Sequence, residues 1–293
     1  MLKSTGRYKA FDLKYQDYYK APMHVWPGWF HIASSLRFPL LTGACSPAVP
    51  QHLFWESDIA KWIEGVSYFL RDRDDPALRK EVDHLVNLIE SAQQPDGYLN
   101  IHFVVCEPEK RWTNLRDLHE LYNAGHLIEA AVAHFALTGS KQLVNVMLRF
   151  IDYTVTVFGR EESKLRGYPG HPEIELALLR LYHATGEKRC LELADYFLTE
   201  RGTDGGKYYT DEQARRGEHP QMAPEMMPKK QSYWYMQAHK PIAEQETVEG
   251  HSVRAMYLLT AAADLGTTPL AAERKNLIEA AWRLWRNMSL AKT

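Results

Sequence analysis

The chain has 293 residues, with 35 lysines and arginines scattered among 37 aspartates and glutamates. Its length is enough for a large buried core, and the near balance of charge argues against nucleic acid or an anionic membrane surface as a partner. No run approaches the roughly 20 apolar residues of a membrane span, and the N-terminus MLKSTGRYKAFDL lacks a signal peptide's apolar stretch, so we expect a cytoplasmic protein.

Helical periodicity runs along nearly the whole chain, and no strand pattern competes with it. We expect a helix near 9–19, followed by four helical hairpins. Their ranges and turns are 59–89 with a turn at RDRDDPA, 127–155 with a turn at Gly139, 173–202 with a turn at Gly186, and 252–288 with a turn around Gly266. The sequence therefore predicts an all-α fold of about nine helices.

The segment 202–245 interrupts this pattern. It is polar, weakly periodic and contains prolines, and its aromatic residues gather at Tyr233, Trp234 and Tyr235. Long ordered loops are usually functional. Hairpins of similar length with one enlarged loop suggest a single domain over 1–293, an α/α toroid with a long rim loop at 202–245.

The three cysteines, Cys45, Cys106 and Cys190, do not form a recognisable site. Their number is odd and they lack Cys-x-x-Cys spacing, so the sequence indicates neither a disulfide framework nor a cysteine metal knuckle. We interpret them as buried or idle thiols.

A Gly-His pair stands three times before an Ala/Leu-rich helical run: Gly125-His126, Gly170-His171 and Gly250-His251. One interpretation is that the three histidines occupy equivalent positions on a common surface. The alternative for each is a helix cap or a satisfied core histidine. A fourth histidine, His119, lies seven residues before His126 and shares its helix face. Position 123 is Asn, so the His-Glu-x-x-His motif of zinc proteases is absent.

Two further stretches carry polar groups at element ends. In GYPGHPEIELAL, Pro172, Glu173 and Glu175 fit the first turn of a helix, but this does not account for His171. In QQPDGYLN, the Asp-Gly turn delivers Tyr98 into a loop, and we interpret Tyr98 as a packed structural residue.

Five motifs in this order resemble the bacterial β-L-arabinofuranosidases of glycoside hydrolase family 127: WESDIAKWIEGVSYFL, AQQPDGYLN, RWTNLRDLHELYNAGHLIEAAVAH, GYPGHPEIELALLRLY and EQETVEGHSVRAMYL. The resemblance runs from about Thr5 to the C-terminus. It implies an (α/α)6 barrel, followed in full-length members by β-sandwich domains, that removes terminal β-L-arabinofuranose. It also carries the family's sugar-binding histidines onto His119, His171 and His251, and so selects His119 rather than His126.

The resemblance further implies a retaining mechanism with a zinc-bound Cys thiolate as nucleophile and a Glu as acid/base. In the family these groups follow a Thr-Gly-Gly-Ile-Gly-like segment, which we do not find before Thr293. We therefore expect no catalytic residue, metal ligand or cofactor in this chain, zinc only in full-length relatives, and an incomplete toroid. One smaller departure is Ala243, where relatives commonly carry Arg.

These observations leave several functions open. The first is a glycoside hydrolase-like protein that takes an arabinofuranoside or related sugar. The second is a noncatalytic sugar-binding remnant, or the N-terminal half of a split enzyme that a C-terminal half completes. The third is another α/α-barrel sugar enzyme, an epimerase or lyase with His as acid/base. Because an open toroid exposes apolar inner-helix surface, we also expect self-association.

Overall fold

The computed structural model describes residues 11, 55–105, 107–217 and 233–291. These residues form ten α-helices and no strand, apart from an isolated bridge between Phe158 and Leu165. The predicted all-α fold is therefore confirmed. The helix expected near 9–19 and the residues Cys45 and Cys106 lie outside the described residues. In the part of the chain that the structure describes, no helix is both long and apolar enough to cross a membrane.

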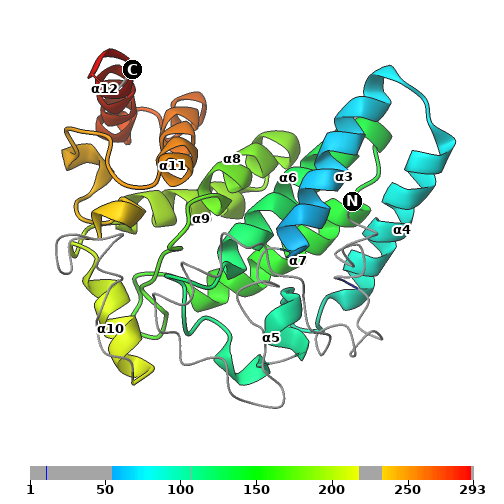
Figure 1. Cartoon of the computed structure of the whole chain (residues 1–293), viewed down its shortest axis with the longest axis horizontal. Helices are drawn as coiled ribbons and strands as arrows, with labels where there is room; N and C mark the ends of the chain where they lie inside the picture. The colour runs from blue at the N-terminus through cyan, green and yellow to red at the C-terminus, as the bar shows by residue number, and fades with distance from the viewer. Residues whose placement is uncertain (1–10, 12–54, 106, 218–232, 292–293) are drawn as a thin grey trace, which may run out of the picture.

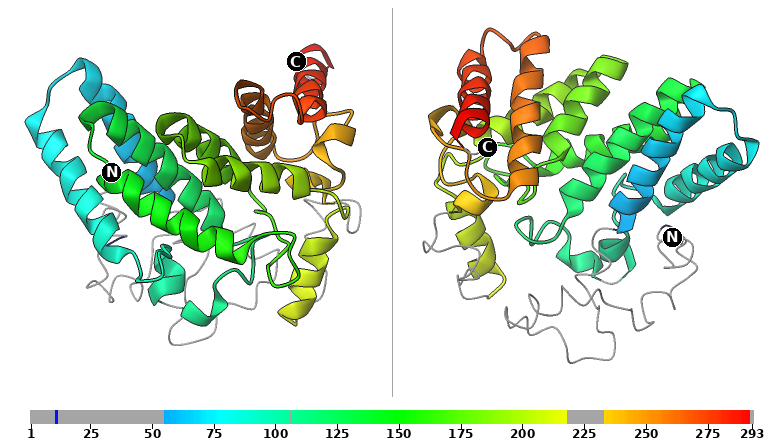
Figure 2. Two further views of the ribbon diagram at one scale, coloured as in Figure 1. Left: turned by 180° about the vertical axis from the view of Figure 1, so that it is seen from behind. Right: turned by 45° about the horizontal axis from the view of Figure 1, so that its top comes forward.

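Eight of the helices pair into the four hairpins expected from the sequence. They are α3 (Trp55–Asp72) with α4 (Pro76–Ala92), α6 (Glu120–Thr138) with α7 (Gln142–Val157), α8 (Ile174–Thr185) with α9 (Lys188–Glu200), and α11 (Ser252–Asp264) with α12 (Lys275–Ala291). Helices α3, α6, α8 and α11 contact one another in that order and form an inner row, and α4, α7 and α9 form an outer row. The described helices thus make a two-layered arc of an α/α toroid (Figures 1 and 2).

Local signals account for the hairpin turns. Asp75 caps α4, because its carboxylate accepts from the amides of Ala77 and Leu78 at 3.0 and 3.1 Å. Gly139 and Gly186 end α6 and α8 in the left-handed region, with φ of 72° and 76°. Gly266 was expected to play the same part, but it lies inside the 3-10 helix Leu265–Thr267.

Two helices were missed by the sequence reasoning, α5 (Ile101–Val105) and α10 (Lys207–Arg215), so the described residues hold ten helices where the four hairpins accounted for eight. Helix α10 lies inside the segment that the sequence predicted as a rim loop. Its buried residues are two tyrosines, Glu212 and Gln213. A helix that buries polar groups does not produce an apolar stripe, and periodicity therefore fails to find it. The same segment holds the 3-10 helices Trp234–Met236 and Ile242–Glu244.

Burial differs between the middle and the flanks of the arc. Helix α6 is buried on all sides from Glu120 to Ala131, because α3, α7 and α8 all contact it. Large exposed apolar side chains lie instead on the flanking hairpins, where Phe69 of α3 is 45% exposed and Trp282 and Trp285 of α12 are 65% and 50% exposed. Apolar surface is thus available at both flanks, and self-association stays a prediction.

Candidate functional site

Three histidine rings meet where three inner helices begin. His119 is the N-cap of α6, His251 is the N-cap of α11, and His171 lies three residues before the start of α8. The ring centroids of His119 and His171 are 5.6 Å apart, and those of His171 and His251 are 5.9 Å apart. All three rings are partly buried. The structure therefore brings together the three residues that the family resemblance selected, and we call them the histidine cluster.

The prediction that the histidines of the three Gly-His pairs occupy equivalent positions is wrong. His126 lies inside α6, in its second turn, where only 4% of its surface is exposed. Each of the three glycines is instead required by a different close approach. An added Cβ would meet Glu173 Cγ at 2.6 Å from Gly125, the Arg116 carbonyl oxygen at 2.0 Å from Gly170, and the Trp234 carbonyl oxygen at 2.5 Å from Gly250.

Hydrogen bonds to the backbone set the tautomers of the cluster. The Nδ1 atom of His119 lies 2.8 Å from the Asp117 carbonyl oxygen, and that of His171 lies 2.7 Å from the Pro172 carbonyl oxygen. Because a carbonyl oxygen only accepts, these two Nδ1 atoms donate, and each Nε2 is an acceptor. The Nδ1 of His251 instead accepts from the Arg254 amide at 3.5 Å, so its Nε2 carries the proton. In their neutral forms the three rings thus contribute, besides these backbone contacts, two acceptor nitrogens and one donor nitrogen.

Burial also keeps the three rings neutral. Desolvation, together with the positive charge of Arg254, lowers the pKa of His119 to about 3. Desolvation and the same arginine lower the pKa of His171 and of His251. At neutral pH the cluster therefore carries no charge of its own.

Three tyrosines surround these rings. Tyr122 of α6 and Tyr257 of α11 have ring centroids 4.5 and 5.9 Å from that of His171. Tyr235, from the predicted rim loop, packs edge-on against His251 at 5.6 Å. Aromatic rings beside polar hydrogen-bonding groups suit the apolar face and the hydroxyl edge of a sugar.

Arg254 stands beside the cluster on the first turn of α11. It is 8% exposed, and its guanidinium carbon lies 4.9 Å from the ring centroid of Tyr235. Among the described residues, its buried Nε and Nη1 atoms have no hydrogen-bond partner. A buried guanidinium with two unsatisfied nitrogens is costly, and this position is therefore a candidate for ligand recognition.

Sequence reasoning missed three members of this surrounding layer, although helical spacing carried a signal for each. Tyr122 follows His119 by three positions, Arg254 follows His251 by three, and Tyr257 follows Arg254 by three. Residues three apart share a helix face. Listing the polar and aromatic residues on the face of each predicted histidine would have found them.

A buried ion pair positions the segment that carries His171. Arg201 and Glu175 are fully buried and lie 2.9 Å apart. The guanidinium of Arg201 also donates to the carbonyl oxygens of Pro169 at 2.7 Å and Met236 at 3.0 Å. The loop before α8 and the turn that carries Tyr235 are therefore held by one side chain from the end of α9.

Helix α10 fixes the approach to His119 in a similar way. The Glu212 carboxylate accepts from the amides of Leu115 at 2.6 Å and Arg116 at 3.3 Å. The amide of Gly170 in turn donates to the Leu115 carbonyl oxygen at 2.8 Å, which joins the approaches to His119 and His171. The segment predicted as a rim loop is therefore a structural support of the cluster.

A neutral pair lies between α6 and the start of α8. His126 Nδ1 is 3.2 Å from a Glu173 oxygen, and both side chains are buried. Burial raises the pKa of Glu173 to about 9 and lowers that of His126 to about 3. At neutral pH a protonated carboxyl thus faces a neutral imidazole.

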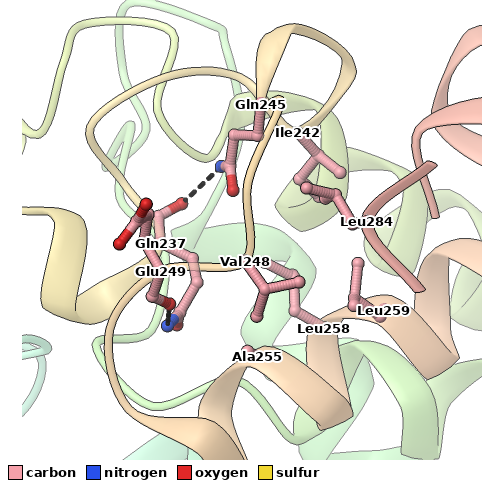
Figure 3. A pocket seen from close by; sticks show the side chains of 9 residues that line it. All are labelled: Gln237, Ile242, Gln245, Val248, Glu249, Ala255, Leu258, Leu259 and Leu284. Atoms are coloured by element: carbon pink, nitrogen blue, oxygen red, sulfur yellow. Dashed lines mark hydrogen bonds between the residues drawn. The ribbon is translucent and has the colours of Figure 1, made fainter. Parts of the chain in front are cut away.

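A separate pocket between α11, α12 and residues 237–249 is too small for a sugar (Figure 3). Its volume is about 10 Å³, which is about one water molecule. Gln237 and Gln245 close it, because the Gln237 amide donates to the Glu249 carbonyl oxygen at 2.8 Å and the Gln245 amide donates to the Gln237 carbonyl oxygen at 3.2 Å. This pocket is therefore not the binding site.

The described residues do not fit the zinc that the family resemblance implies for relatives. Among them, no group of three or more histidines, cysteines or carboxylates is placed to hold a metal ion. Cys190, on α9, is buried, and burial raises its pKa to about 12, so it is not a thiolate at neutral pH. We derive no step through zinc or through this thiol.

Comparison with known proteins gives a consistent result. Residues 14–293 match the family model described as the β-L-arabinofuranosidase, GH127 catalytic domain. A non-reducing end β-L-arabinofuranosidase of Bifidobacterium longum subsp. longum is 39% identical over 240 residues, which cover 80% of this chain and 35% of that protein.

Two solved structures of the same kind are similar. A GH127 β-L-arabinofuranosidase from Geobacillus stearothermophilus T6 has a TM-score of 0.74 and 46% identity, over 81% of this chain and 36% of that one. A second GH127 β-arabinofuranosidase has a TM-score of 0.72 and 28% identity, over 98% of this chain and 38% of that one. The chain thus spans little more than a third of the length of the relatives it matches.

Proposed function

This chain belongs to the β-L-arabinofuranosidases of glycoside hydrolase family 127, and from that premise we propose that its histidine cluster binds the arabinofuranosyl unit of a glycoside. His119, His171 and His251 would hold the hydroxyl groups. The observation that carries the proposal is the meeting of three neutral rings, with two acceptors and one donor, at the starts of three inner helices.

The chemistry of hydroxyl groups supports this assignment. Each sugar hydroxyl both donates and accepts, so a site with donors and acceptors can satisfy two neighbouring hydroxyls at once. A buried site built in this way discriminates strongly against a ligand without the hydroxyl, because its own polar groups would then stay unpaired. The tyrosines around the cluster offer apolar contact to the ring.

Hydrolysis needs more than these groups. A retaining glycosidase requires a nucleophile and an acid/base on either side of the glycosidic bond. The histidine cluster and the tyrosines around it supply neutral imidazoles and phenols, the nearby Asp117 carboxylate is engaged by Arg116, and Cys190 is a protonated thiol on α9. We therefore assign sugar binding to this part of the molecule, and assign the bond-breaking groups to the family's remaining length, in the same polypeptide or in a complementing C-terminal half.

The neutrality of the cluster disfavours an epimerase or lyase with histidine as acid/base. Such a group works best with a pKa near the working pH. The pKa of His119 is about 3, and those of the other two rings are also lowered. Hydrogen bonding to the sugar is the role that these neutral rings suit better.

The binding test is calorimetric titration with methyl β-L-arabinofuranoside. We expect His119→Ala, His171→Ala and His251→Ala each to weaken binding by roughly tenfold or more, as the loss of a buried hydrogen bond does. The matched control is His84→Ala, at an exposed position on the outer helix α4, which should bind as the unaltered chain does. Unchanged affinity in all three cluster variants would refute the proposal.

Turnover is tested separately with a chromogenic β-L-arabinofuranoside, with and without zinc and thiol. We expect no hydrolysis by the 293 residues alone. Hydrolysis should return when the polypeptide that follows the matched region in the Bifidobacterium relative is supplied, joined or separate. Turnover by the 293 residues alone would contradict our assignment of the bond-breaking groups, but it would leave the binding proposal standing.

A further inference from the structure

Arg254 is a charged residue beside the histidine cluster, and the proposed sugar contacts do not use it. Its backbone amide donates to His251 Nδ1 at 3.5 Å, and its guanidinium stacks at 4.9 Å on Tyr235, whose ring packs on His251. It is therefore joined to the cluster at two points. Its Nε and Nη1 atoms are buried, and within the part of the chain that the structure describes they have no hydrogen-bond partner. Helix capping and stacking explain the position of this side chain, but they do not explain its uncompensated charge.

The groups that face this arginine do not neutralise it. Among the described residues they are Asp117 and His119 before α6, Tyr122 of α6, His171 before α8, Arg201 after α9, Tyr209 of α10, Tyr235 of the 3-10 helix and His251 of α11. The single carboxylate among them, Asp117, is already engaged by the guanidinium of Arg116, at 2.8 and 2.6 Å. The positive charge therefore remains directed at the neutral rings.

A second cation, from α3, also acts on the cluster. Lys61 of α3 donates to the Tyr122 hydroxyl at 2.9 Å, and the Tyr122 ring packs on both His119 and His171. Glu173, which lies near Lys61, stays protonated because burial raises its pKa to about 9. Among the described residues, Arg254 and Lys61 thus place positive charge beside the cluster, whereas Asp117 is engaged by Arg116 and Glu173 is protonated.

We propose that Arg254 is a positioning residue that makes the histidine cluster selective for uncharged sugars. It orients His251 and places a fixed positive charge beside three neutral rings, so the site accepts a neutral polyol and rejects a ligand with a cationic ring. This inference rests on the proposed sugar binding. It adds a charge criterion that hydrogen bonding alone would not impose.

Neutrality of the rings is tested without any ligand, by nuclear magnetic resonance titration of the histidine ring protons. In the unaltered chain, the His119 ring should stay neutral down to about pH 3. In Arg254→Gln we expect the three cluster rings to titrate at higher pH, because a nearby positive charge has been removed. Arg254→Lys keeps the charge and should keep the low titration. The matched control Arg189→Gln removes one charge from α9 and should change nothing. Titration in Arg254→Gln equal to that of the unaltered chain would overturn the inference.

Ligand selectivity is tested with two compounds, methyl β-L-arabinofuranoside and a pyrrolidine iminosugar with the same ring hydroxyls, which is protonated at neutral pH. The measured quantity is the ratio of their dissociation constants. We expect this ratio to shift by roughly tenfold toward the iminosugar in Arg254→Gln, and to be retained in Arg254→Lys and Arg189→Gln. An unchanged ratio in Arg254→Gln overturns the selectivity but leaves the proposed function intact. Failure of the neutral glycoside to bind the unaltered chain overturns both.

Discussion

The two ends of the α6/α7 and α8/α9 hairpins are built by different means. At the turn ends, Gly139 and Gly186 terminate α6 and α8, and the amide of each donates a hydrogen bond to a carbonyl oxygen only four residues back. At the histidine end, Arg201 reaches Met236 across 35 residues, and Glu212 reaches Leu115 across 97. The difference teaches that the turns are independent local structures. The histidine cluster instead depends on several distant segments at once, and we expect these segments to unfold cooperatively.

The strongest test of this comparison removes the buried arginine at the histidine end. Arg201→Met leaves Glu175 as a buried carboxylate without its partner, and should lower the free energy of unfolding by about 3–5 kcal/mol in urea denaturation. The control Arg189→Met removes the surface ion pairs that Arg189 of α9 makes with Asp152 and Glu187. It should lower the free energy of unfolding by about 0–1 kcal/mol. Equal losses in the two variants would refute a cooperative histidine end.

A second test compares a glycine at each end. In Gly170→Ala the new Cβ would lie 2.0 Å from the Arg116 carbonyl oxygen, so the backbone must move, at a cost of roughly 2–3 kcal/mol. In Gly139→Ala the space is open and only the left-handed φ is unfavourable, which costs about 1 kcal/mol. Chemical denaturation gives both values. Only Gly170→Ala should also shift the ring resonances of His171, and a shift in Gly139→Ala would contradict the separation of the two ends.

A third test uses pH. Because the folded-state pKa of Glu173 is raised to about 9, its protonated form stabilises the fold fully below the unfolded pKa near 4.5, and this stability is lost as pH rises toward 9. Glu173→Gln is neutral at every pH and should remove this loss. The slope of unfolding free energy against pH between 6 and 8 should flatten by up to about 1.4 kcal/mol per pH unit. Parallel slopes in the two proteins would show that Glu173 is not held protonated.

The smallest expected effect lies at the first hairpin turn. Asp75→Ala removes the cap of α4, whose carboxylate accepts two backbone amides, and should cost about 1 kcal/mol in thermal or urea unfolding. The resonances of the histidine cluster should be unchanged, because this turn shares no contact with it. Altered cluster resonances would show that the turn ends are coupled to the site.

Much of the fold was predictable because its signals are local. The four hairpins follow from apolar residues at helical spacing, and Gly139, Gly186 and Asp75 act within a few residues of their own helices. Helix α10 escaped prediction because Glu212, one of its buried residues, is polar. Glu212 is buried because its carboxylate accepts hydrogen bonds from the amides of Leu115 and Arg116. No local sequence pattern reveals these partners.

The candidate site was predictable only in part. Periodicity and the Gly-His repeat pointed to His126, which the structure places inside α6 beside Glu173, and it was the longer family motifs that selected His119. Arg254 and Tyr122 were missed although each lies three positions after a cluster histidine; that spacing makes them neighbours on the helix, and only the structure shows which rings they contact.

The sequence by itself determined the four helical hairpins, the turns at Asp75, Gly139 and Gly186, and the family, since these depend on residues close together along the chain or on long contiguous motifs. The tertiary structure alone decided which histidines meet, which ring nitrogen of each carries the proton, and that the rings stay neutral. Those properties depend on burial and on backbone partners brought together by packing. The physical reason is that desolvation and hydrogen-bond geometry are set in three dimensions, among segments that lie far apart along the chain.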